Sequence, residues 1–171
     1  VHKNTGEVKD IDLATALLRA GRYDEALRAI SPVIELDPTY ARGHSTLGWA
    51  YLKKGLSDEG LTELKKAVTL APDNTNWLAQ LGQAYGLVGK VGEAREVLQQ
   101  LQELSRQRYV SPYHMAYVYT GLGEQDTAID WLERACVERA GAVYGIMGSF
   151  LFTTLRSHPR FTALLKKMNL A

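Results

Sequence analysis

Small and apolar residues recur along this chain at intervals of 34 positions. Glycine marks the interval, with leucine or tyrosine four positions before it and isoleucine or leucine nine positions after it. The glycines are Gly21, Gly55, Gly89 and Gly123, preceded by Leu17, Tyr51, Tyr85 and Tyr119 and followed by Ile30, Leu64, Leu98 and Leu132. Apolar residues between these positions step by three and four, which predicts helices. A fixed period in the thirties predicts that the helices stack as repeated units.

Each period is expected to hold two helices that are separated at the glycine. Gly21 ends the first helix, because glycine adopts a left-handed backbone conformation at low cost. The second helix runs from Tyr23 and stops before Asp37-Pro38, since proline disfavours helix in the residue before it. The second repeat ends likewise at Ala71-Pro72. Short side chains are expected where two helices approach closely, at Ala26, Gly48, Gly82 and Ala94.

The residues around the period resemble the tetratricopeptide repeat, a helix–turn–helix whose pattern reads L-G-x2-Y, then A-x3-F, then P. Repeat two carries Leu47-Gly48, Tyr51, Gly60, Leu64 and Pro72 at the matching positions. The resemblance implies an all-α fold, a right-handed α-solenoid of four repeats at about 7–40, 41–74, 75–108 and 109–140. The usual leading tryptophan is replaced by Asp10, His44, Leu78 and Pro112, and the closing proline becomes Arg106 and Ala140 in the later repeats. These departures affect the helix ends and not the fold.

The two ends of the chain fall outside the period. Residues 1–8 are polar and are interpreted as a linker. Residues 141–171 are apolar at first and then predict a short helix from Pro159 to Met168. A solenoid needs terminal caps, since its last repeat otherwise exposes its stacking face. We therefore expect residues 141–171 to form C-terminal capping helices.

The end of the chain is also similar to that of a bacterial group of multidomain signalling proteins. The residues that carry this likeness are 131–135 (WLERA), 155–161 (LRSHPRF) and Leu164-Leu165. In that group a tetratricopeptide array follows a kinase, adenylate cyclase or DNA-binding domain. The likeness implies the C-terminal part of a larger bacterial regulatory protein. The chain begins with Val1 rather than methionine, which fits a fragment.

Composition and charge exclude several classes of partner. Lys plus Arg number 20 and Asp plus Glu 19, so no strong field favours nucleic acid or an anionic membrane. No apolar run reaches the roughly 18 residues of a membrane-spanning helix. The single cysteine, Cys136, excludes an internal disulfide framework and fits a reducing compartment. A cytoplasmic location is expected.

No motif of the sequence indicates catalysis. The glycine loop that binds phosphates, the GxSxG and HExxH motifs and paired cysteines are all missing. His44 and His114 fall two repeats apart, too far to share a metal, and His44 is expected to be partly buried between helices. Cys136 is interpreted as a small buried hydrophobe, because no cation or helix N-terminus would activate it. The chain is therefore expected to be no enzyme and to use neither metal nor cofactor.

The surface with most information is the concave groove, which the first helix of each repeat lines in this fold. Residues three and four positions apart on those helices share one face. The groove is expected to be apolar and aromatic and to bind an extended or helical peptide or protein segment. The residues predicted to bind are Arg42, Ser45, Trp49 and Leu52 in repeat two, Asn76 and Gln83 in repeat three, and Tyr113 and Tyr117 in repeat four. The alternative is that Trp49 and Tyr117 pack as ordinary core.

Other functions stay open at this level. Some family members bind the C-terminal carboxylate of chaperones with a Lys, Asn and Arg clamp, which Ile11, Thr15 and Ser45 cannot form, so that partner is not expected. An alternative function is a structural scaffold or homodimer, with Ile11 and Leu18 or the segment 143–152 exposed for pairing. A third is a small-molecule pocket near Trp131 and Tyr144.

Overall fold

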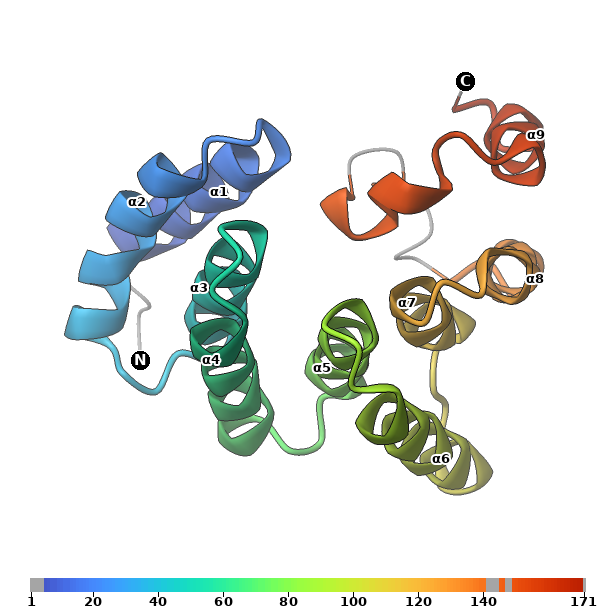
Figure 1. The fold of residues 1–171 in the computed structure, drawn as a ribbon, viewed down its shortest axis with the longest axis horizontal. Helices are drawn as coiled ribbons and strands as arrows, with labels where there is room; N and C mark the ends of the chain where they lie inside the picture. The colour runs from blue at the N-terminus through green and yellow to red at the C-terminus, as the bar shows by residue number, and fades with distance from the viewer. Residues whose placement is uncertain (1–4, 141–144, 147–148, 171) are drawn as a thin grey trace. The chain divides into compact units, whose positions relative to one another are not determined.

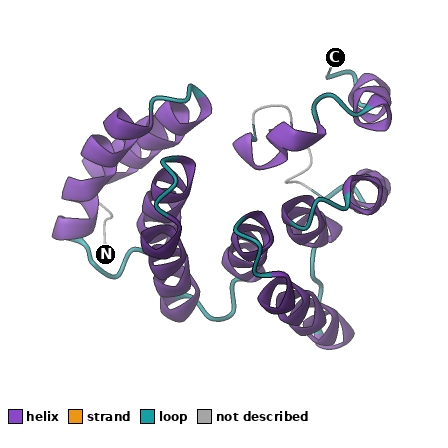
Figure 2. Cartoon of the chain, viewed as in Figure 1, coloured by secondary structure: helices purple, strands orange, loops and turns teal. Residues whose placement is uncertain are grey.

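The computed structural model (Figure 1) describes residues 5–140, 145–146 and 149–170, with residues 5–8 described by their backbone alone. All regular structure in these ranges is helical, and none of it is strand (Figure 2). The predicted all-α fold class is confirmed. None of the helices in the same ranges is long and apolar enough to cross a membrane.

The helices follow one another in the pairs that the period predicts. Helix α1 begins at Thr5, so residues 5–8, which were interpreted as part of a linker, are helical. The chain divides into two compact units, Val1–Trp77 and Leu78–Ala171, and each is described by itself. The repeat helices are α1 (Thr5–Arg19), α2 (Tyr23–Leu36), α3 (Ala41–Lys53), α4 (Ser57–Leu70), α5 (Thr75–Leu87), α6 (Val91–Gln107), α7 (Pro112–Gly121) and α8 (Gln125–Val137).

Glycine ends the first helix of every repeat as predicted. The backbone φ angle is +73° at Gly21, +82° at Gly55, +81° at Gly89 and +77° at Gly123. These values lie in the left-handed region, where a side chain beyond hydrogen costs free energy. The backbone N–H of the following residue then returns to the helix, as Leu56 does to the carbonyl of Tyr51 at 3.0 Å. Glycine therefore recurs at this position of the period because each first helix ends in a left-handed backbone conformation.

The core of the first unit contradicts one prediction. Ile11 is 0% exposed and belongs to a cluster with Ala14, Ile30, Val33 and Leu47. Leu18 is also buried. The interpretation of Ile11 and Leu18 as exposed residues for self-association is wrong, because α1 uses both to pack its own unit. His44 is buried as expected, with Nδ1 2.6 Å from Glu63 Oε2 and Nε2 2.8 Å from the carbonyl of Pro38.

Close helix approach in the second unit depends on glycine. A Cβ atom built on Gly82 would lie 2.6 Å from Val97 Cγ1 on α6 and 2.9 Å from Val118 Cγ2 on α7, which confirms the expected close approach there. A second approach, between Gly86 of α5 and Gly121 of α7, was not predicted. A Cβ atom on Gly86 would lie 2.5 Å from the carbonyl carbon of Gly121. At this point the backbones of α5 and α7 touch.

The C-terminal segment adds a 3-10 helix, η2 (Phe150–Leu155), and helix α9 (Pro159–Lys167). Helix α9 contacts α8, where Arg160 pairs with three carboxylates, the nearest being Asp130 Oδ1 at 2.6 Å. Helix η2 instead lies beside α7 (Figure 1). Helices η2 and α9 therefore pack on different helices of the second unit.

Candidate peptide-binding surface

The predicted groove residues of α3 are used within the first unit. Arg42 pairs with Asp12 of α1, with 2.5 Å between Nη2 and Oδ1. Ser45 is buried. Trp49 is 2% exposed and Tyr117, on α7, is 6% exposed, so both are buried as the alternative of core packing predicts. Leu52 is half-buried and packs over Gly60 of α4, where an added Cβ would lie 2.6 Å from Leu52 Cγ. These four residues do not form an open recognition surface on α3.

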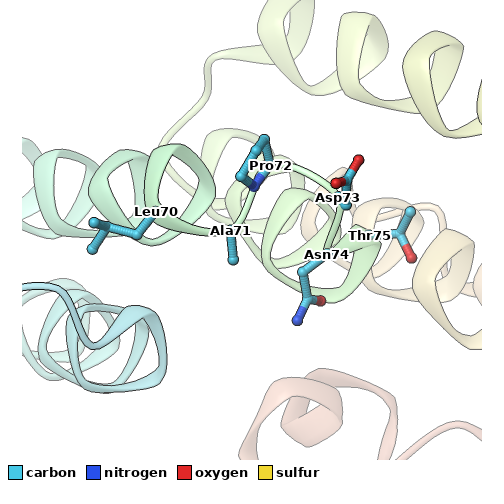
Figure 3. Close-up of a pocket in the computed structure, with 6 residues that line it drawn as sticks. All are labelled: Leu70, Ala71, Pro72, Asp73, Asn74 and Thr75. Atoms are coloured by element: carbon cyan, nitrogen blue, oxygen red, sulfur yellow. The ribbon is translucent and has the colours of Figure 1, made fainter.

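Asn76 lies in the first turn of α5, beside the turn that leads into that helix. Its backbone N–H donates to Asn74 Oδ1 at 3.0 Å, so Asn74 satisfies one of the free donors at the helix start. A shallow pocket follows the same turn (Figure 3) and is lined by Leu70, Ala71, Pro72, Asp73, Asn74 and Thr75. The amide of Asn74 thus serves the helix start, and the pocket gathers no set of convergent functional groups.

Gln83, Tyr113 and Tyr117 converge on one segment of the chain itself. Gln83 is 1% exposed, and its Nε2 donates to the carbonyl of Leu151 at 2.6 Å. The ring of Phe152 lies 5.1 Å from that of Tyr113 and 5.2 Å from that of Tyr117, the latter nearly parallel at 21°. The two tyrosine rings meet edge to face at 5.0 Å. We call the surface formed by Gln83, Tyr113 and Tyr117 the α5–α7 face.

Leu151 and Phe152 belong to this site and were not predicted as part of it. The sequence marks residues 150–152 as an apolar run, and it was interpreted as a cap for the last repeat. The sequence did offer one indication of this contact, because both the run 150–152 and the helix that carries Tyr113 and Tyr117 are rich in aromatic residues. The small-molecule pocket was considered near Trp131 and Tyr144. Tyr144 lies outside the described residues, and the guanidinium of Arg134 lies over the Trp131 ring, 5.2 Å from its centroid.

The α5–α7 face is uncharged around neutral pH. Burial, with Tyr113 close by, raises the pKa of the Tyr117 hydroxyl well above its usual value. Burial lowers the pKa of His114, whose ring stacks on Tyr117 at 6.4 Å, from 6.5 to about 4. Both groups therefore stay neutral at pH 7, and the contacts described at this face are ring contacts and hydrogen bonds.

The lowered pKa of His114 predicts a loss of stability in mild acid. The unfolded chain binds a proton at this residue below pH 6.5, while the folded chain does so only near pH 4. The free energy of unfolding should therefore fall by about 2 kcal/mol between pH 7 and pH 5 through this residue. Urea unfolding of wild type and His114→Phe at both pH values measures it. Equal losses in the two proteins would contradict the assignment.

Metal binding and thiol chemistry find no support among the residues that the structure describes. They contain no group of three or more His, Cys, Asp or Glu side chains placed to hold a metal ion. Burial raises the pKa of the Cys136 thiol, which lies 3.3 Å from the sulfur of Met168. A thiol with a raised pKa is a poor nucleophile.

Comparison with known proteins gives one family. The family model described as "Tetratricopeptide repeat" matches residues 11–75. Human "Tetratricopeptide repeat protein 13" is 31% identical over 96 residues, 53% of this chain and 11% of its own length. "Small glutamine-rich tetratricopeptide repeat-containing protein 2" of Saccharomyces cerevisiae is 38% identical over 52 residues, 30% of this chain and 15% of its own. The chain thus spans a small part of these curated relatives.

The solved structures extend the likeness to nearly the whole chain. The structure of MamA (AMB-1) has 27% sequence identity and a TM-score of 0.51, and the match covers 97% of this chain and 98% of that one. The fold of the described residues is therefore that of a helical repeat protein.

Proposed function

This chain belongs to the tetratricopeptide repeat family of protein-interaction modules, and we propose that it binds a peptide or protein segment through the α5–α7 face. It would act by binding alone, with the rings of Tyr113 and Tyr117 as anchors and the amide of Gln83 as the main-chain contact. Aromatic anchors bury a large area with little loss of side-chain entropy, and a few polar groups then fix the peptide's position.

One observation supports this proposal. The α5–α7 face already contacts polypeptide in the two ways that a peptide groove uses. Gln83 holds a main-chain carbonyl at 2.6 Å, and both tyrosine rings pack on a phenylalanine ring. Neither contact depends on a charged group.

The residues of α3 have a supporting role in this proposal. Ser45 and Trp49 are buried, and Arg42 joins α3 to α1. They would hold the first unit in shape, while Gln83, Tyr113 and Tyr117 make the contacts to the partner. Asn76 lies at the start of α5, where its backbone N–H is capped by Asn74, and in this proposal it supports the helix and does not contact the partner.

The module would serve as the docking part of a longer bacterial regulatory protein in the cytoplasm. The similarity of residues 131–135 and 155–161 to the ends of bacterial signalling proteins supports this context. A net charge of +1 fits a protein partner better than nucleic acid.

Affinity capture with cross-linking tests the proposal. The wild-type chain is compared with Gln83→Met, which keeps the side-chain volume and removes both hydrogen-bonding atoms. Gln100→Met, at an exposed position on α6, is the matched control. We expect a partner that cross-links to α7 in the wild type and the control and is lost with Gln83→Met. A partner retained by all three proteins, or capture of copies of the same chain alone, would reject the α5–α7 face and favour a scaffold or homodimer.

A further inference from the structure

We infer that the segment Ser149–Leu155 is a resident ligand of the α5–α7 face, and that the partner is an extended peptide with an uncharged aromatic side chain that displaces it. This inference rests on the proposed function, because it names the chemistry of the partner at the same surface. It also adds a consequence, since the partner must compete with a part of this chain.

The segment meets the face as a bound peptide would. Leu151, Phe152 and Leu155 are buried, and Phe152 is 1% exposed, while Thr153 and Thr154 between them are exposed. The 3-10 helix η2 in this segment is interrupted at Phe152, which has φ −109° and ψ 20°. One side of a short, irregular stretch therefore supplies every contact to α5 and α7 described above.

The resident segment satisfies half of the Gln83 amide. Nε2 donates to the carbonyl of Leu151, while Oε1 is buried and has no hydrogen-bond partner among the described residues. A buried acceptor without a donor costs free energy. The backbone N–H of Leu151 cannot supply it, because this N–H donates to Ser149 Oγ at 3.3 Å within the turn.

An extended peptide can satisfy both atoms of the amide. Its backbone presents carbonyl and N–H groups that no internal turn consumes, so one could accept from Nε2 and another donate to Oε1. An aromatic side chain would replace the ring of Phe152 between Tyr113 and Tyr117. A charged side chain would lose its hydration there without a partner of opposite charge, since His114 and Tyr117 are neutral at pH 7.

Competition from the resident segment weakens binding of a peptide in trans. A tethered segment acts at an effective concentration in the millimolar range. A variant that loosens the segment should therefore bind a free peptide at least about tenfold more tightly than the wild type. A free peptide therefore displaces the segment only if it binds the α5–α7 face tightly enough to overcome this effective concentration.

Fluorescence anisotropy of the full chain with a labelled peptide of residues 149–157, SFLFTTLRS, tests the inference. We expect Phe152→Ala to bind this probe at least about tenfold more tightly than the wild type. The matched control is Thr154→Ala, which changes an exposed side chain of the same turn and should leave the affinity unchanged. Adding Gln83→Met to Phe152→Ala should remove the gain. Equal affinity of Phe152→Ala and wild type, with both folded by circular dichroism, overturns the inference.

Two further measurements cover a Phe152→Ala variant that fails to fold. In the wild type, saturating probe should speed hydrogen exchange of the amides of Thr153 and Thr154 while α7 stays protected, and unchanged exchange overturns displacement. A probe N-methylated at the position of Leu151 should bind about tenfold more weakly than one N-methylated at the position of Thr154, since it lacks the donor for Oε1. Equal binding of the two probes overturns the extended pairing.

The two proposals fail in different ways. If captured partners depend on Gln83 but the probe never displaces the segment, the inference fails and the function stands. If the probe displaces the segment but no captured partner depends on Gln83, the segment is exchangeable and the proposed function fails.

Discussion

Gly121→Ala is expected to destabilise the second unit by about 3 kcal/mol or more. A Cβ atom at this position would overlap the backbone carbonyl oxygen and Cα of Gln83 on α5. A side chain in the way could rotate, but a helix backbone can move only if the whole helix shifts. Since Gln83 also holds Leu151, that shift would disturb the α5–α7 face as well. Urea unfolding of the full chain, followed by circular dichroism, measures the loss.

Gly92→Ala is the matched control for this prediction. Gly92 is a helical glycine in the first turn of α6, and an added Cβ would meet nothing within 4 Å. Alanine has the higher helix propensity, so this variant should be as stable as the wild type or up to about 1 kcal/mol more stable. If Gly121→Ala unfolds at the same urea concentration as Gly92→Ala, the helices α5 and α7 do not approach as closely as described.

The sequence predicts those parts of the fold that local chemistry determines. Gly21 and Gly55 end their helices because each position needs a left-handed backbone, which is a property of the residue itself. Helix α7 begins with Ser111 as its cap and Pro112 in the first turn, which the dipeptide alone indicates. The glycine requirement repeats with the period, so the ends of the first helices follow from the sequence, while the cap of α7 follows from its own dipeptide.

The candidate site depends on contacts that the period does not contain. Gln83 and Leu151 are 68 positions apart, which is two periods, but Leu151 lies beyond the four repeats, so the period does not predict their contact. A helix face also gives no indication of which neighbour covers it. The same face was predicted to be open at Ser45, which is buried, and at Arg42, which is half-exposed and paired with Asp12.

The α5–α7 face is buried because the segment Ser149–Leu155 packs on it. A peptide groove needs apolar rings, and exposed apolar surface promotes nonspecific association. A segment of the same chain that covers the rings of Tyr113 and Tyr117 removes this surface until a better ligand is present. The cost of that protection is the reduced affinity that the competition experiment measures.

Trp49→Ala is expected to destabilise the first unit by about 3–5 kcal/mol, as truncation of a buried aromatic residue does. Trp49 is 2% exposed and is among the largest fully buried side chains. Shortening a residue that only lines a groove lowers the stability of the fold little. The size of the loss therefore distinguishes Trp49 as a core residue from Trp49 as a groove residue. Trp77→Ala, which removes a half-buried tryptophan, is the matched control and should cost less. Urea unfolding of both variants measures the difference. A loss for Trp49→Ala below about 1 kcal/mol would mean that its ring is free to contact a partner, and α3 would then return as a candidate binding surface beside the α5–α7 face.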